Sequence, residues 1–221
     1  MRVVAIALYS LALSATTATT ANAGGQNKLQ DPKTAVEQVF WPQLYGAGGT
    51  SLYCGKTFNS EGGQFVASPV YPTKQIKSSL RCITDKQCAE KNSQYPFMLA
   101  DLHNLYPELA RVELARRNSL FGALGDAVPS KFGDIDCDLK ASFQLVEPRN
   151  EAKGNVARAL FYMHVEYDLP IPGQVQMFKQ WHQMDPPDAE EKARNDRIAE
   201  LQGTRNRFID NPELVDQQIS N

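Results

Sequence analysis

Four cysteines constrain this chain more than any other feature, because all of them follow an N-terminal segment typical of exported proteins. They are Cys54, Cys82, Cys88 and Cys137. An even number of cysteines in an oxidising compartment favours two disulfides. We favour Cys82 with Cys88, which closes a short loop, and Cys54 with Cys137, which ties an early segment to a distant one. A zinc site is the alternative, but the spacings are not C-x-x-C and no histidine lies near either end.

The N-terminus predicts a secretory signal peptide over residues 1–23. A positive charge at Arg2 precedes an apolar run over 3–13, and small residues end at Ala23; this order is typical of signal peptides. The apolar run is shorter than the roughly 20 residues that a bilayer requires. A buried N-terminal helix is the alternative, but the threonines between 16 and 20 would break its apolar face.

The rest of the chain predicts one exported domain over 24–210 and a polar tail over 211–221. The chain has 221 residues, and the part beyond the signal peptide is the right size for a single domain with a sizeable core. A formal net charge of −2 argues against a protein that coats nucleic acid non-specifically, because such proteins carry a basic surface. We expect a monomer in the periplasm or outside the cell, with no membrane segment.

Helix and strand signals are mixed along the chain, which gives an α+β class: a single domain with a largely helical C-terminal half. Trp41-Pro42 is expected to end the first helix, and Gly203 to end the last one. The tail from Asn211 is expected to be loose. Helices are expected over 31–40, 95–102, 108–118, 152–167, 175–184 and 189–201, and strands over 51–53, over 65–71 and within 131–148.

Several strings of residues occur together in a specific order. They are Tyr53-Cys54-Gly55, Asp101-Leu102-His103-Asn104-Leu105-Tyr106-Pro107, Glu147-Pro148-Arg149, Arg158-Ala159-Leu160-Phe161-Tyr162-Met163, Trp181-His182, Asp185-Pro186-Pro187 and Asn195-Asp196-Arg197-Ile198. In this order and spacing the chain resembles the endonuclease I family of periplasmic and secreted bacterial nucleases, roughly from Phe40 to Asp210.

The resemblance implies a β-β-α metal motif, also called a His-Me finger, within a mixed domain. In that motif a histidine takes a proton from water, and one divalent metal ion, Mg²⁺ or another, stabilises the developing charge. A neighbouring Glu and a helix-borne Asn hold the metal, and an Arg binds the phosphate. Family members cut DNA, and often RNA, without sequence preference, so DNA or RNA is the implied partner.

The Glu-His pair of the family is replaced in this sequence. It lies three residues before a proline in a string like Glu-His-Val-Tyr-Pro, and the corresponding string here begins with Ser68 and Pro69. Proline has no side-chain proton acceptor, so Pro69 cannot act as the general base. Ser68 would at most be a weak, neutral metal ligand.

The phosphate-binding Arg of the family lies in the loop between the two close cysteines, and Asp85 occupies its position. A carboxylate there reverses the local charge and repels a phosphodiester. Lys86 matches the family and is a candidate phosphate contact. The alternative for Lys86 is an ordinary solvated lysine.

The metal-binding Asn of the family falls six residues after the proline of the His-Asn-Leu-x-Pro string, which gives Glu113 here. A Glu can bind a hard metal ion, with Ser68 opposite it. The alternative is a helix carboxylate paired with Arg116 or Arg117. Arg116 and Asn118 match an Arg-x-Asn pattern of the family and are expected to support the helix.

The three histidines are expected to be structural. His103 lies in the best-matching string, and we expect it to form a buried hydrogen-bonded scaffold with Asp101 and Asn104. Two hypotheses remain. An active nuclease with a rebuilt site would need a new base, such as Glu61 or His103, and a divalent metal. A non-catalytic descendant would bind nucleic acid or a protein partner and need no cofactor. With three site positions changed, we expect hydrolysis to be weak or lost.

Overall fold

The computed structural model describes residues 24–59 and 63–220, so the expected signal peptide and Glu61 lie outside the described residues. The helices are α1 (Pro32–Thr34), the π-helix η1 (Ala35–Leu44), α2 (Thr73–Ser79), α3 (Asp85–Lys91), α4 (Tyr95–Leu99), α5 (Ala110–Arg116), the 3-10 helix η2 (Gly133–Ile135), α6 (Asn150–Tyr167), α7 (Val175–Met184), α8 (Ala189–Gln202), α9 (Arg207–Asp210) and α10 (Leu214–Gln218). The strands are β1 (Gly49–Thr50), β2 (Thr57–Phe58), β3 (Phe65–Pro69), β4 (Leu105–Leu109), β5 (Leu120–Phe121), β6 (Ser130–Phe132), β7 (Cys137–Ser142) and β8 (Leu145–Glu147).

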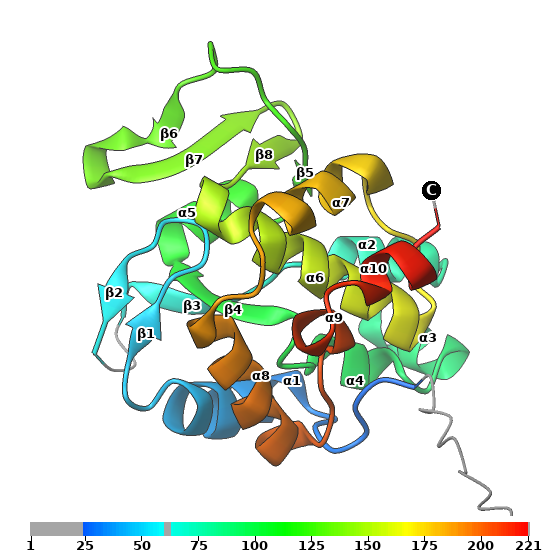
Figure 1. The fold of residues 1–221 in the computed structure, drawn as a ribbon. Helices are drawn as coiled ribbons and strands as arrows, with labels where there is room; N and C mark the ends of the chain where they lie inside the picture. The colour runs from blue at the N-terminus through cyan, green and yellow to red at the C-terminus, as the bar shows by residue number, and fades with distance from the viewer. Residues whose placement is uncertain (1–23, 60–62, 221) are drawn as a thin grey trace, which may run out of the picture.

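The long helix α6 forms the centre of the domain. Val156, Leu160 and Phe161 in its middle are completely buried, and α7 and α9 pack against it. Figure 1 shows the sheet of β6, β7, β8 and β5 at one end of the molecule, with the C-terminal helices around α6 and the β3–β4 pair beside α5. The predicted α+β class and the helical C-terminal half are confirmed.

Strands β3 and β4 and helix α5 form a compact β-β-α unit. The two strands are antiparallel, with Ser68 opposite Tyr106 and Pro69 opposite Leu105. Helix α5 begins directly after β4 and packs against both strands. The predicted strand from 65 is confirmed in part, because it ends at Pro69 and not at Tyr71.

The chain N-terminal to α5 differs from the prediction. We expected the helix to begin at Glu108, but Glu108 and Leu109 belong to β4, and Leu109 is the N-cap of α5. Leu114 lies in this predicted segment and is 65% exposed. The buried side of α5 is instead formed by Val112 and Arg116, which face the strands.

The first helix also runs further than predicted. Trp41-Pro42 does not end it, because the π-helix η1 continues to Leu44 and Tyr45 donates its N–H to the carbonyl of Phe40. The wider π-turn removes the clash that a proline ring makes with the preceding turn of an α-helix. The ring of Trp41 packs edge-on against Phe58, with centroids 5.9 Å apart, so an aromatic cluster holds this end of the helix.

The end of the chain is more ordered than predicted. We expected the tail from Asn211 to be loose, but it forms α10, and Val215 and Ile219 are 2% exposed. Two apolar side chains spaced four residues apart are enough to fasten one helical turn to the core. The predicted stop at Gly203 is confirmed: it has a φ of +87° and donates its N–H to Ala199.

The cysteines form the two disulfides that the sequence analysis favours. Cys54 is joined to Cys137 at the start of β7, and Cys82 is joined to Cys88 in α3. The first disulfide fastens the segment after β1 to the four-stranded sheet. The second closes the loop between α2 and α3, so the described cysteines leave no thiol for a metal site.

Candidate functional site

The β-β-α unit brings Ser68 and Glu113 into direct contact. Ser68 is completely buried near the end of β3, and its hydroxyl donates a hydrogen bond to the Glu113 carboxylate on α5. The side chain of Glu113 is 17% exposed. The two residues that the resemblance assigns to the family's metal-binding positions therefore lie together, and they bind each other.

Arg116 lies one turn along α5 and completes a closed network. Its Nη1 donates to the carbonyl oxygen of Pro69 at 2.5 Å, and its Nη2 donates to that of Val70 at 2.7 Å. The same Nη1 lies 3.5 Å from Oε2 of Glu113. The guanidinium, which is fully buried, therefore holds the end of β3 and neutralises the Glu113 carboxylate.

The residues present do not fit a divalent metal ion. Ser68 and Glu113 offer one hydroxyl and one carboxylate, whereas Mg²⁺ takes about six oxygen ligands in near-octahedral geometry. The Arg116 guanidinium already supplies a positive charge next to that carboxylate. Within 24–59 and 63–220, no three His, Cys, Asp or Glu side chains gather as metal ligands would.

Two buried polar atoms at the site also lack hydrogen-bond partners. They are the hydroxyl of Tyr53 and the Nε of Arg116. The two side chains are in contact, with the guanidinium carbon 5.4 Å from the centre of the Tyr53 ring. Burial raises the pKa of Tyr53 above its ordinary value, and arginine stays charged. Neither group can accept a proton from water.

No imidazole reaches this site. His103 contacts the carbonyl oxygen of Thr204 through Nε2 at 3.1 Å. His164 contacts the carbonyl oxygen of Leu169 through Nδ1 at 2.6 Å, and His182 contacts that of Pro212 through Nε2 at 3.1 Å. The chain has three histidines, and none of these hydrogen bonds involves Ser68, Pro69 or Glu113.

Asp101 is the hub of the buried scaffold in which His103 lies. One Asp101 oxygen accepts hydrogen bonds from the backbone N–H of His103 at 2.9 Å and from the side-chain amide of Gln202 at 2.8 Å. The other oxygen accepts the hydroxyls of Tyr162 and Tyr167 at 3.0 and 2.6 Å. This hub ties the approach to β4 to helices α6 and α8.

Asn104, next in the same string, connects the hub to the candidate site. Its side-chain oxygen accepts the backbone N–H of Tyr71 at 2.6 Å, and its amide nitrogen donates back to the Tyr71 carbonyl at 3.2 Å. Tyr71 lies two residues beyond Pro69, so this pair of bonds fixes where β3 ends. The geometry agrees with the scaffold role expected for Asp101, His103 and Asn104.

The burial of His103 predicts a specific loss of stability in acid. Burial lowers its pKa from 6.5 to about 4, so the folded state resists protonation. The stabilisation is present above pH 6.5 and is lost as the pH falls towards 4, by roughly 3 kcal/mol in total. In urea unfolding across this window, His103→Gln should give a flatter pH dependence than the parent. All other titratable groups are the same in the two proteins. If the free energy of unfolding changed equally with pH in both, the prediction would be contradicted.

Asp85 does not join Ser68 and Glu113. It pairs with Lys77 at 2.8 Å and accepts the Tyr95 hydroxyl at 2.6 Å, and these hydrogen bonds, with Lys77 first, lower the pKa of Asp85. Lys86 is 88% exposed and lies 4.0 Å from Glu90 on its own helix. The family's phosphate-binding position is thus occupied by a neutralised carboxylate, and Lys86 lies in solvent.

A separate groove runs beside the β-β-α unit. It consists of two adjoining hollows that share Lys74 and Asn118, and we call it the Lys74 groove. Ile83 lines one end and Phe143 the other; they are 82% and 86% exposed. Neither hollow is lined by a carboxylate, and one of them also contains Lys77.

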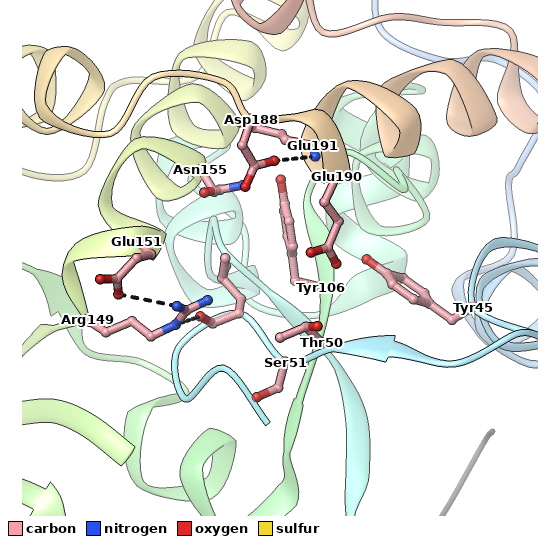
Figure 2. A pocket seen from close by; sticks show the side chains of 11 residues that line it. Tyr45, Thr50, Ser51, Tyr106, Arg149, Glu151, Asn155, Asp188, Glu190 and Glu191 are labelled. Atoms are coloured by element: carbon pink, nitrogen blue, oxygen red, sulfur yellow. Dashed lines mark hydrogen bonds and ion pairs between the residues drawn. The ribbon is translucent and has the colours of Figure 1, made fainter. Parts of the chain in front are cut away.

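A second pocket lies between β1 and the start of α8, and Figure 2 shows it. Some of its polar groups bind one another: Arg149 donates to the Leu52 carbonyl and to Glu151, and Asp188 caps α8 by accepting the N–H of Glu191 at 2.7 Å. With several carboxylates in its lining, this pocket would repel a phosphate. The Lys74 groove is the better match for an anionic ligand.

A model of a known family, described as endonuclease I, matches residues 19–213. The chain belongs to the endonuclease I family. It is 36% identical over 137 residues to an extracellular ribonuclease of Bacillus amyloliquefaciens, covering 53% of this chain and 45% of that protein. It is 32% identical over 148 residues to an extracellular deoxyribonuclease of Aeromonas hydrophila, covering 64% and 63%. A periplasmic deoxyribonuclease of Aeromonas hydrophila is 32% identical over 146 residues, covering 64% and 61%.

The resemblance to endonuclease I that the sequence strings indicate is therefore confirmed. The match does not extend over the whole of these relatives, because the chain covers between 45% and 63% of their lengths. The Lys74 groove was missed by sequence reasoning, since its lining comes from three separate segments of the chain. The one feature of the sequence that could have indicated this groove is Phe143, a large apolar residue between the polar residues Ser142 and Gln144.

Proposed function

We propose that this chain is an exported endonuclease I-family protein that binds nucleic acid and hydrolyses it very slowly or not at all. The observation that supports this proposal is the closed network of Ser68, Glu113 and Arg116 beside Pro69. By the resemblance, the network lies where the family holds a metal and a histidine. Ser68 and Glu113 bind each other there, and Arg116 binds Glu113 and the backbone of β3.

The expected loss of rate is large. A general base contributes about 10² to 10⁴ to the rate of such reactions, and Pro69 removes it. A metal ion that stabilises the developing charge contributes further, and Ser68 with Glu113 does not offer the ligands to hold one. The cation for the phosphate is lost as well, since Asp85 occupies its position.

Nucleic acid is the ligand class that the relatives and the surface both support. The relatives are named as ribonucleases and deoxyribonucleases. The Lys74 groove presents Lys74 and Lys77 with no carboxylate in its lining. The net charge of −2 implies modest affinity that weakens steeply with salt.

Export is supported by the disulfides and by the names of the relatives. The chain has two disulfides, and disulfides are stable in oxidising compartments and rare in the cytosol. The named relatives are extracellular or periplasmic. In the described part of the chain, no helix combines the length and apolar character needed to span a bilayer.

A plasmid-nicking assay tests the lost hydrolysis. Purified protein in Mg²⁺ or Mn²⁺ is expected to nick supercoiled DNA no faster than a buffer blank, because Pro69 replaces the family's general base and the Glu113 carboxylate is bound by Ser68 and Arg116. An active family member assayed alongside is the positive control. Turnover at the rate of that control would overturn the proposal. If the Glu61→Gln variant then lost this turnover, Glu61 would be identified as the base of a rebuilt site.

A salt titration tests the binding. Labelled DNA is expected to bind at low ionic strength, and the logarithm of the affinity should fall linearly as the logarithm of salt concentration rises, because phosphate contacts release counterions. Absence of binding at the lowest salt would rule out a nucleic-acid ligand and favour a protein partner.

A further inference from the structure

The Lys74 groove is built from three segments that lie far apart in the sequence. Helix α2 contributes Lys74 and Gln75, the segment after α5 contributes Asn118, and the turn between β7 and β8 contributes Phe143 and Gln144. The β-β-α unit and the four-stranded sheet hold these segments in place (Figure 1). Ser68, Pro69, Glu113 and Arg116 are not among the residues that line the groove.

Phe143 is the most unusual side chain of the groove. Its ring is 86% exposed, although full burial of a Phe side chain is worth about 1.5–3 kcal/mol. The ring is nevertheless carried by a fixed turn. Gln144 has a φ of +61° and accepts the backbone N–H of Leu120 at 2.9 Å. An anchored aromatic side chain that no protein group covers is suited to stack on a flat ligand.

The charges of the groove favour a phosphate next to that ring. Among the residues that the structure describes, Lys74 forms no ion pair, and it lines both hollows. Lys77 stands beside it and is partly neutralised by Asp85. Since the lining has no carboxylate, the residues that line the groove carry no negative charge that would repel an anion.

We propose that the Lys74 groove binds single-stranded nucleic acid, with a base stacked on Phe143 and the adjoining phosphate held by Lys74. This inference rests on the proposed function, and it specifies the form of nucleic acid that is bound. The amide side chains of Gln75, Asn118 and Gln144 both donate and accept hydrogen bonds, so they can contact the edge of any base.

The stacking contact is what selects a single strand. In a duplex each base is covered by its neighbours above and below, so its flat face is not accessible to a side chain. In a single strand the bases are free to turn outward and stack on aromatic rings. Phe143 therefore contributes to the binding of a single strand and contributes little to the binding of a duplex, whereas Lys74 contributes to both.

The test uses the whole chain and two fluorescent probes, an oligo-dT single strand and a blunt DNA duplex of equal length, with binding followed by anisotropy at low salt. We expect the single strand to bind more tightly. Because stacking is worth about 1–3 kcal/mol per base, Phe143→Ala should weaken its binding about 5- to 150-fold and leave duplex binding unchanged. Phe143→Trp should retain it.

Two further variants separate stacking from charge. Lys74→Ala should weaken both probes and reduce the salt slope by about 1. Met184→Ala is the matched control, because Met184 is an apolar side chain that is 67% exposed and lies outside the groove. This variant should bind both probes as tightly as the parent does. Thermal melts of all variants check folding.

The outcomes distinguish this inference from the proposed function. If neither probe binds the parent, the nucleic-acid role itself is wrong. If both bind equally and Phe143→Ala has no effect, only the single-strand inference is overturned. Tighter binding of the duplex overturns it as well, whatever the variants do.

Discussion

The triple variant Ser68→Glu, Pro69→His, Glu113→Asn is expected to nick supercoiled plasmid in Mg²⁺ at least about 100-fold faster than the parent, the lower end of what a general base contributes. Ser68 and Pro69 are consecutive on β3, and Ser68 already contacts position 113 on α5. The backbone therefore presents these positions to one another, and the resemblance to endonuclease I specifies the side chains that are missing.

The control for this restoration is the double variant Ser68→Glu, Glu113→Asn, which keeps Pro69. It restores the ligand types for a metal without a proton acceptor, so it should bind Mg²⁺ in calorimetry and still fail to nick DNA. Adding Asp85→Arg to the triple variant should increase the rate further, because it restores a cation for the phosphate. A folded triple variant that binds Mg²⁺ and nicks no faster than the parent would show that Pro69 is not what limits the chemistry.

The candidate site could be predicted from the sequence as far as the resemblance to endonuclease I supplies it. Ser68 on β3 and Glu113 on α5 are 45 residues apart, and α2, α3 and α4 lie between the two strands, so the family strings and not the spacing indicated that they meet. Asp85 could not be placed in this way. It opens α3, and its direction is set by Lys77 and Tyr95, which are partners that no spacing rule identifies.

The fold was predictable where the pattern of apolar residues was regular. The helix over 175–184 has a clear apolar face and lies where it indicates. The helix predicted over 152–167 is also present, as α6, and it is buried on all sides from Val156 to Met163. Strand β4 was missed because its sequence, Leu-Tyr-Pro-Glu-Leu, contains a proline and a glutamate, and neither residue type is typical of a buried strand, although all five of its residues are buried. Tertiary contacts determine whether such a segment forms a strand or a helix.

Removing the Cys54–Cys137 disulfide is expected to lower the free energy of unfolding by about 4 kcal/mol, against about 2 kcal/mol for Cys82–Cys88. The two disulfides differ in the length of chain they close, with separations of 83 and 6 residues. In the unfolded chain the longer loop forfeits more conformational entropy, so breaking it favours unfolding more. The measurement is urea denaturation of two double Cys→Ala variants.

The matched pair of variants isolates the effect of loop length. Each replaces two cysteines that are less than 10% exposed by alanine, so the loss of packing is similar in both. Equal destabilisation of the two variants would mean that the folded state, and not the entropy of the unfolded chain, determines what these disulfides contribute.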